Sequence, residues 1–316
     1  MLAGIAWVAY FASQPLAIPP DGRRLEVGPG ATFRAVTRQL VASGALREPY
    51  SFLVLGRALG KAGAVKAGIY ALPPSITPYG LLDKMARGEV EQSSVTFIEG
   101  WTFAQLRASL DNHPDVRHDS TGLSDAELLR RLKASESHPE GRFFPDTYRF
   151  NSGASDLSIM SRAYHTMETR LRAAWERRVS GLPYETPYEA LIMASIVEKE
   201  TGRPEDRRMI AAVFVNRLRK GMRLQTDPTV IYGMGKSFDG NLRKRDLEAD
   251  GAYNTYLRAG LPPTPIALPG QAALDAALDP APSAVLYFVA RGDGTSEFST
   301  SLEEHNRAVK KYQMQR

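Results

Sequence analysis

The chain contains no cysteine, and this absence excludes several kinds of chemistry. Without thiols there is no disulfide, no zinc–thiolate site and no cysteine nucleophile. The five histidines are scattered and show no HExxH pair or other metal-ligand spacing, so we expect no metal and no cofactor. The chain also lacks a GxSxG elbow, a Walker loop and a GxGxxG motif, and these absences remove three common classes of enzyme from consideration.

Charged side chains are missing from residues 1–20, and residues 2–12 form an apolar run. A membrane-spanning helix needs about 20 residues, so the run is short, but Trp7 and Tyr10 suit a membrane interface. We expect a single-pass anchor over residues 1–20, with its basic cytoplasmic stub upstream of Met1. A cleaved signal peptide and a buried core helix are the alternatives.

The remaining composition is that of ordinary globular material. The 316 residues are 43% hydrophobic and 24% charged, enough for two or three domains with cores of their own. A net charge of +5 suits an anionic surface such as lipid headgroups or an acidic polymer. The excess is too small and too scattered to indicate a nucleic-acid partner.

Residues 21–90 predict a small α/β unit that ends with a third helix opened by Thr77 and Pro78. Turn and capping signals delimit its earlier elements, which are a strand at 25–27, helices at 32–41 and 50–59, and a strand at 68–72. The β-α-α-β order is that of small glycan-binding modules of the LysM kind. We therefore expect an α+β protein with a LysM-like subdomain over 21–90 and a second mixed α+β domain over 91–316.

The second domain shows both helical and strand patterns. We expect a strand at 94–98, helices at 103–110, 124–132, 155–179, 188–201 and 205–219, a helix beginning at Asp227-Pro228, and a hairpin of 285–290 with 297–300. An aromatic, turn-rich stretch at 139–148 separates the second and third of these helices, and its rings suit either a core or a site.

The helix at 188–201 carries the pattern of greatest chemical interest. Residues 190–197 are apolar except for Ser195, and a helix that is apolar nearly all round is buried. Glu198 and Glu200 follow at its C-terminal end, where the helix dipole disfavours carboxylates. Glu200 shares a face with the apolar residues three, four and seven positions earlier, so its pKa should rise.

A carboxylic acid kept protonated near neutral pH can donate its proton to a leaving-group oxygen. Glu200 is therefore our candidate for a general acid. The alternative is that both glutamates reach solvent and pair with Arg203 or Arg207.

Polar and aromatic side chains downstream of this helix are candidates for a cleft that binds sugar. Amides and hydroxyls can bond sugar hydroxyls, and aromatic faces can stack on sugar rings. Asp227 is also well explained as a helix N-cap. The candidate binding residues are Asn216, Arg217, Gln225, Thr226, Asp227, Tyr253, Asn254 and Tyr256.

Several ordered motifs resemble the endolytic murein transglycosylases, also called MltG or YceG-like proteins. They run from about residue 26 to residue 306 and comprise Phe144-Pro145-Asp146-Thr147-Tyr148, Ser195-Ile196-Val197-Glu198-Lys199-Glu200-Thr201-Gly202, Phe214-Val215-Asn216-Arg217-Leu218, Leu224-Gln225-Thr226-Asp227-Pro228-Thr229-Val230, Tyr253-Asn254-Thr255-Tyr256, Gly260-Leu261-Pro262-Pro263 and Tyr287-Phe288-Val289. The resemblance implies that the catalytic glutamate is Glu200, because Glu200-Thr201 is similar to the Glu-Ser pair of other lytic transglycosylases. Glu198 is the fallback.

The resemblance further implies an enzyme that cuts MurNAc–GlcNAc bonds within peptidoglycan strands and leaves 1,6-anhydroMurNAc ends. It implies an inner-membrane protein with a periplasmic catalytic domain, which would cut nascent strands beside peptidoglycan synthases. A hydrolase that uses Asp227 as its second carboxylate is one alternative. A non-catalytic, membrane-anchored glycan-binding scaffold is the other.

Overall fold

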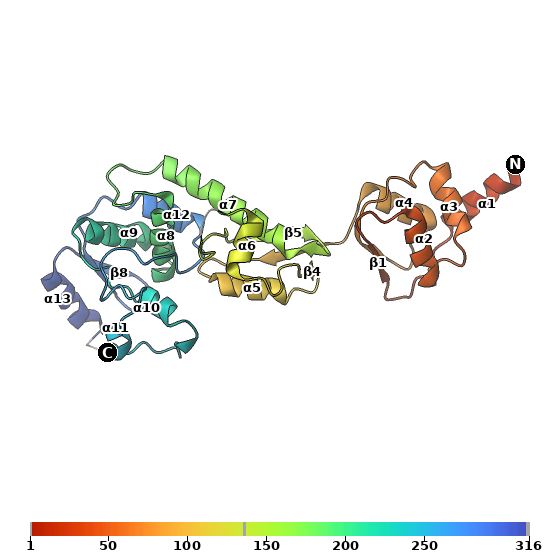
Figure 1. Cartoon of the computed structure of the whole chain (residues 1–316). Helices are drawn as coiled ribbons and strands as arrows, with labels where there is room; N and C mark the ends of the chain where they lie inside the picture. Colours follow the sequence, from red (N-terminus) through yellow and green to blue (C-terminus); the bar gives the residue numbers. More distant parts are fainter. Residues whose placement is uncertain (1, 135–136, 314–316) are drawn as a thin grey trace. The chain divides into compact units, whose positions relative to one another are not determined.

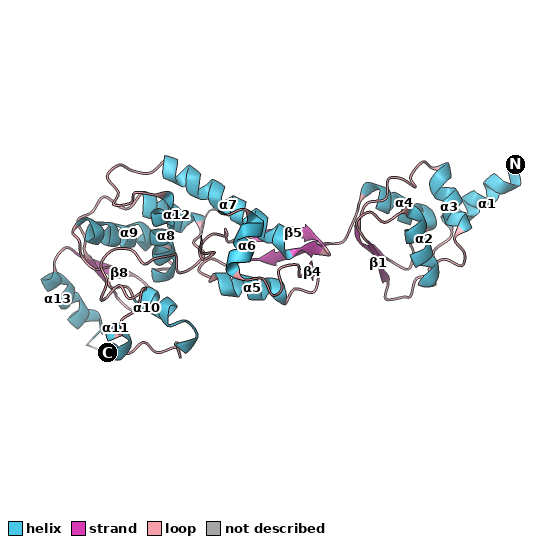
Figure 2. Ribbon diagram, viewed as in Figure 1, coloured by secondary structure: helices cyan, strands magenta, loops and turns pink. Residues whose placement is uncertain are grey.

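The computed structural model describes residues 2–134 and 137–313, and its secondary structure is mixed α+β as the sequence predicts (Figures 1 and 2). The chain divides into two compact units. Unit 1 comprises the residues up to Ser94 together with His113–Arg117 and Arg149–Ser155, and unit 2 comprises the remainder. Helices dominate both units, while the strands are short and pair two by two.

Unit 1 is built around an antiparallel strand pair and the helices that pack on it. β1 (Arg23–Val27) pairs with β2 (Gly68–Leu72), and α2 (Phe33–Ala42) and α3 (Tyr50–Ala58) lie between them in sequence. α4 (Pro78–Arg87) follows. The predicted β-α-α-β order is confirmed, and the likeness of this unit to LysM modules stays a prediction.

Local sequence explains where these helices begin and end. The Thr32 and Thr77 hydroxyls accept hydrogen bonds from backbone N–H groups in the first turns of α2 and α4, as N-cap residues do. Gly88 ends α4 in a left-handed conformation, which glycine adopts without steric cost. The apolar faces meet in a core that includes Leu25, Leu40, Phe52, Tyr70, Leu81 and Met85.

The N-terminal helix α1 (Leu2–Ser13) has 12 residues. Among the described residues, no helix has the length and apolar character that crossing a membrane requires. The spanning helix predicted over residues 1–20 is therefore not seen. Val8 and Phe11 pack against the core of unit 1, whereas Trp7 and Tyr10 are 53% and 65% exposed.

Short strands and three helices lie in the middle of the sequence. β3 (Gln92–Thr96) pairs with β5 (Thr147–Asn151), and β4 (Val116–Arg117) pairs in parallel with β6 (Ala154–Ser155). The helices are α5 (Phe103–Asp111), α6 (Asp125–Leu132) and α7 (Asp156–Glu176). Phe143, Phe144 and Tyr148 are buried, so the aromatic stretch supplies core rather than an exposed site.

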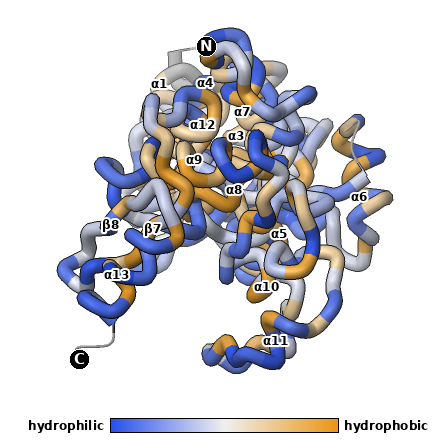
Figure 3. The backbone as a smooth tube through the Cα atoms, turned by 90° about the vertical axis from the view of Figure 1, so that its left-hand side faces the viewer, coloured by the Kyte–Doolittle hydropathy of each residue, from blue (hydrophilic) through white to orange (hydrophobic). Residues whose placement is uncertain are grey.

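The centre of unit 2 is a bundle around α8 (Pro187–Glu200), which is packed by α7, α9 (Pro204–Arg219), α10 (Asp227–Met234) and α12 (Gln271–Leu278). Every residue of α8 from Ala190 to Val197 is buried, as the all-round apolar pattern predicts. In Figure 3 the tube is orange around α8 and α9. The sequence analysis missed α12, although this helix packs extensively on α8.

The C-terminal part of unit 2 contains an antiparallel hairpin and a final helix. β7 (Tyr287–Ala290) pairs with β8 (Ser296–Ser299), and α13 (Leu302–Gln313) packs on both. The predicted hairpin is confirmed, but its first strand begins at Tyr287 and not at 285. The Val285 carbonyl instead accepts a hydrogen bond from the side chain of Asn216. We call residues 287–313 the C-terminal module.

Candidate active site

Glu200 is the last residue of α8, and the construction of that helix determines where the carboxyl lies. Thr186 and Glu189 form a capping box at the N-terminus of α8, and the buried middle of the helix holds it in the core. Thr201 then leaves the helix in an extended conformation. The Glu200 side chain is partly buried, and its Oε1 accepts a hydrogen bond from the Thr226 hydroxyl.

Burial raises the pKa of Glu200 to about 7, the direction that the sequence predicts. The hydrogen bond from Thr226 opposes this rise because it favours the charged form. The negative charge of Asp227 adds to the rise. Among the described residues, no lysine or arginine forms an ion pair with Glu200. A carboxyl with this pKa is about half protonated at neutral pH, as a general acid requires.

Glu198 has a different environment, although it lies only two residues away. Its carboxylate accepts a hydrogen bond of 2.9 Å from the Gly270 N–H and lies 3.8 Å from the Arg207 guanidinium. Burial raises its pKa as well, against the effect of Gly270 and Arg207. Glu198 thus ties α8 to the N-terminus of α12. The alternative that both glutamates reach solvent and pair with Arg203 or Arg207 is wrong, because Glu198 lies near Arg207 with its side chain only 7% exposed and Glu200 has no ion pair with either arginine.

The segment that holds Thr226 against Glu200 has an unusual backbone. Gln225 has φ of 53°, a left-handed value that is uncommon for a residue with a side chain. Its N–H donates to the Thr255 carbonyl, and the Thr226 N–H donates to the Thr255 hydroxyl. Thr229 bonds that same hydroxyl at 2.8 Å. These bonds hold the turn in place and point the Thr226 hydroxyl at Glu200.

Asp227 begins α10 but does not cap it. The N-cap residue is Thr226, which makes no side-chain capping bond, and Asp227 Oδ1 instead accepts a hydrogen bond of 2.5 Å from the Tyr256 hydroxyl. The N-cap explanation of Asp227 is therefore wrong. The pair brings a second carboxylate and a phenol to the edge of the Glu200 site.

A cavity of about 450 Å³ opens beside Glu200. One wall contains several of the predicted residues, namely Glu200, Arg217, Gln225, Asp227 and Tyr256. The C-terminal module supplies the lining residues Tyr287, Phe288, Val289, Ala290, Leu302, His305, Val309 and Gln313. Pockets of this size with a few convergent polar groups are typical of ligand sites.

Comparison with known proteins identifies the family of this chain. The sequence profile of the YceG-like family matches residues 25–311. The chain belongs to the YceG-like family.

Two relatives of this YceG-like protein have the same name. The chain is 32% identical over 310 residues to a Bacillus subtilis protein named endolytic murein transglycosylase, covering 91% of this chain and 84% of that protein. It is 29% identical over 278 residues to a Streptococcus pneumoniae protein of the same name, covering 78% of this chain. The chain spans only 50% of the length of that pneumococcal protein.

A solved structure has a similar fold. The crystal structure of a YceG-like protein from Listeria monocytogenes matches with a TM-score of 0.56 and 29% identity. The match covers 92% of this chain and 99% of the Listeria chain.

Arg217 lies in the cavity wall of this YceG-like protein, where its Nε and Nη1 groups donate hydrogen bonds to neighbouring oxygens. It is 8% exposed and donates to the carbonyls of Leu286, Arg223 and Leu224 and to the Gln225 side chain. Its guanidinium carbon also lies 4.9 Å from the centre of the Tyr287 ring. Arg217 therefore links α9 to the segment before β7 and to Tyr287, and it supplies positive charge to the cavity.

Four predicted binding residues do not line this cavity, and one of them, Thr226, instead bonds the Glu200 carboxyl. Asn216 donates to the carbonyls of Ser283 and Val285, and it thereby ties α9 to the segment that enters β7. Asn254 is 4% exposed, and its amide donates to two carbonyls of the preceding loop. Tyr253 faces a second cavity, where its hydroxyl bonds Thr264 at 2.8 Å.

This second cavity has a volume of about 800 Å³ and is lined by residues that include Lys199, Tyr232 and Glu140. Glu140 is 3% exposed, and burial raises its pKa to about 7. It accepts hydrogen bonds of 2.9 Å from the Phe103 N–H and 3.0 Å from the Tyr232 hydroxyl. Glu140 thus links the start of α5 to α10, and the sequence analysis did not identify it.

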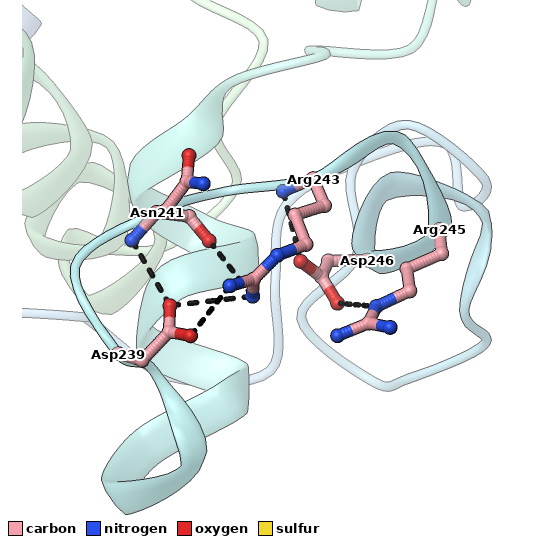
Figure 4. A network of polar contacts seen from close by, with 5 residues as sticks. All are labelled: Asp239, Asn241, Arg243, Arg245 and Asp246. Carbon is pink, nitrogen blue, oxygen red and sulfur yellow. Dashed lines mark hydrogen bonds and ion pairs between the residues drawn. The ribbon is translucent and has the colours of Figure 1, made fainter.

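The loop between α10 and Tyr253 is held by its own polar contacts (Figure 4). Asp239 accepts from the Arg243 guanidinium at 2.6 Å and from the Asn241 N–H at 3.1 Å. Asp246 accepts from the Arg243 N–H at 2.8 Å, at the start of α11 (Lys244–Glu248). These contacts stabilise the loop that leads to Tyr256.

One group of side chains in the described residues has the spacing of metal ligands. Atoms of Asp111, His118 and Asp156 lie within 4.8 Å of one another. The Asp156 carboxylate already accepts hydrogen bonds from Ser120 and from the Leu157 N–H. Those bonds explain the position of Asp156 without an ion.

Proposed function

We propose that this YceG-like protein is an endolytic peptidoglycan lytic transglycosylase with Glu200 as its general acid and base. The observation that carries the proposal is a partly buried carboxyl with a pKa of about 7, without a cationic partner among the described residues, in the wall of a polar cavity. The names of the characterised relatives support the same activity.

In the proposed reaction, protonated Glu200 gives its proton to the glycosidic oxygen between MurNAc and GlcNAc. The C1–O bond breaks as positive charge develops on the sugar. Glu200, now a carboxylate, takes the proton from the MurNAc C6 hydroxyl, which attacks C1 and closes a 1,6-anhydro ring. An intramolecular hydroxyl replaces the activated water of ordinary glycosidases, so a single carboxyl suffices.

The neighbours of Glu200 suit the two halves of this reaction. The Thr226 hydroxyl stabilises the carboxylate that remains after the first proton transfer. The Asp227 carboxylate, bonded to Tyr256, adds negative charge where the sugar becomes positive.

We infer the remaining organisation from the resemblance and from the features of unit 1. Residues 21–90 act as a LysM-like glycan-binding subdomain, and residues 91–316 form the catalytic domain. The apolar residues 1–20, with Trp7 and Tyr10 exposed, attach the protein to the inner membrane. The catalytic part then lies in the periplasm, where it ends nascent strands beside peptidoglycan synthases.

Product analysis tests the activity. Purified glycan strands incubated with the wild type should yield 1,6-anhydro ends by mass spectrometry. Glu200→Gln should lower the rate by at least about 10²-fold, the lower range for removal of a general acid. Glu198→Gln is the matched control, because Glu198 binds Gly270 and Arg207 and does not line the cavity.

Three results would contradict the proposal. Anhydro ends released at near-normal rates by Glu200→Gln would remove Glu200 from the mechanism. Reducing ends that carry the mass of an added water would indicate hydrolysis, and strands that are bound but never shortened would indicate a scaffold.

A further inference from the structure

His305 in α13 lines the Glu200 cavity and is not used by the proposed mechanism. Its ring lies parallel to that of Tyr287, with ring centres 5.2 Å apart and an interplanar angle of 23°. The stacking fixes the plane of the imidazole at the cavity wall. The His305 ring is therefore an oriented polar group among the lining residues that the C-terminal module contributes, most of which are apolar.

The two ring nitrogens of His305 have different surroundings. Nδ1 is inaccessible to solvent and has no hydrogen-bond partner among the described residues. Buried N–H groups without an acceptor are rarer in proteins than unsatisfied acceptors, so we assign the proton of the neutral ring to Nε2. Nε2 is not among the buried atoms without a partner, and no bond to it is formed within the described residues, so it stays accessible.

The same surroundings keep the ring neutral. Burial lowers the pKa of His305, and the positive charge of Arg217 lowers it further. A second proton would have to reside on the enclosed Nδ1. His305 is thus a neutral ring with one outward N–H, which suits an uncharged oxygen acceptor.

We propose that His305 binds the substrate of the Glu200 site through its Nε2–H. The acceptor is an uncharged oxygen of a sugar unit, a hydroxyl or an acetamido carbonyl, held between the C-terminal module and the α8 wall. This inference rests on the proposed function. It assigns the C-terminal module a direct part in holding the glycan across from the acid.

Three substitutions distinguish the roles of the two ring nitrogens of His305. His305→Gln places an amide N–H near the position of Nε2, whereas His305→Asn reaches only the position of Nδ1. His305→Phe keeps the stacking on Tyr287 and removes both nitrogens. Loss of one hydrogen bond to the substrate should lower kcat/KM by about threefold to tenfold, mainly through KM.

The kinetic constants kcat and KM for strand cleavage are measured in each His305 variant. The affinity for glycan strands is measured in proteins that carry Glu200→Gln together with the same His305 substitution. We expect Asn and Phe to weaken binding and raise KM, and Gln to stay close to the wild type. Unchanged binding with Asn and Phe, or equal loss with Gln and Phe, would overturn the proposal.

Two readouts keep this test separate from that of the activity. A wild type that binds strands but releases no anhydro ends refutes the proposed function alone, because the affinity measurement needs no chemistry. Thermal unfolding shows whether each variant folds. Should the Phe variant fail to fold, the comparison of Gln with Asn decides the question.

Discussion

At the scale of single residues, the site depends on the protonation of Glu200 and on the two neighbours that shift it in opposite directions. The Thr226 hydroxyl favours the carboxylate, and the Asp227 charge disfavours it. Because the proposed reaction begins with the protonated acid, activity should fall as the pH rises through the pKa of Glu200.

Substitution of these neighbours should therefore move the alkaline limb of the pH–rate profile in opposite directions. Thr226→Val removes a stabiliser of the charge, so the pKa of Glu200 rises and the limb moves to higher pH. Asp227→Asn removes a repelling charge, so the pKa falls and the limb moves to lower pH. Profiles of kcat/KM measure both shifts, and a limb that does not move in either variant would show that another group controls it.

The raised pKa of Glu200 also has a consequence for stability. A carboxyl whose pKa is about 7 in the folded state and about 4.5 when unfolded favours folding fully below pH 4.5, and the benefit is lost as the pH rises through 7. In Glu200→Gln there is no carboxyl to ionise at this position, so this loss of stability with rising pH does not occur. Relative to the wild type, the variant should gain up to about 3 kcal/mol of unfolding free energy between pH 4.5 and pH 8.

Urea unfolding of both proteins at several pH values measures this gain. Glu140, which also has a raised pKa, is present in both proteins, so its contribution cancels. A difference between the two proteins that stays constant with pH would contradict the assigned environment of Glu200.

At the scale of elements, two loops of unit 2 meet closely at Gly141. Gly141 has φ of 76°, and a Cβ at this position would lie 2.4 Å from the Pro265 Cβ. The absence of a side chain at Gly141 therefore lets the aromatic stretch pack against the proline-rich loop after Gly260.

Gly141→Ala should destabilise unit 2 by about 2–4 kcal/mol, the sum of a left-handed alanine and an overpacked contact. Gly181→Ala is the matched control, because Gly181 has φ of 74° but nothing within 4 Å of its added Cβ. The control should lose only about 1 kcal/mol. Equal losses, measured by thermal or urea unfolding, would show that the contact with Pro265 does not matter.

At the scale of the whole molecule, the two units have separate hydrophobic cores. The unit 1 core draws on residues from Leu16 to Met85, and the core around α8 draws on residues from Phe144 to Leu278. The two cores share no residue, so each should respond to its own substitutions.

Phe52→Ala empties a fully buried position beside Phe33 and should cost unit 1 about 3–5 kcal/mol. Cleavage of short soluble strands should persist at a temperature where unit 2 stays folded. Phe214→Ala, at a buried position in the other core, is the matched comparison and should lower the unfolding temperature and the activity together. Loss of cleavage in Phe52→Ala under those conditions would show that the active site needs unit 1.

Much of the secondary structure was predictable because its signals are local. Thr77 caps α4 as expected, and Thr32 and Thr186 cap α2 and α8 in the same way. α12 was missed, because its short, alanine-rich sequence gains its position by packing on α8. The spanning helix was expected from apolar composition alone, but α1 has only 12 residues and one side of it packs on unit 1.

For the site, the sequence by itself determined that α8 is buried and that Glu200 ends it beside apolar neighbours, since helical periodicity places those residues on one face. Only the tertiary structure decided that Thr226, Asp227 and Tyr256 gather at Glu200, while Asn216 and Asn254 bond backbone carbonyls elsewhere. It alone brought His305 and Tyr287 to the cavity. Helical periodicity is set by bonds within one helix, whereas these tertiary contacts depend on how segments distant in the chain pack together.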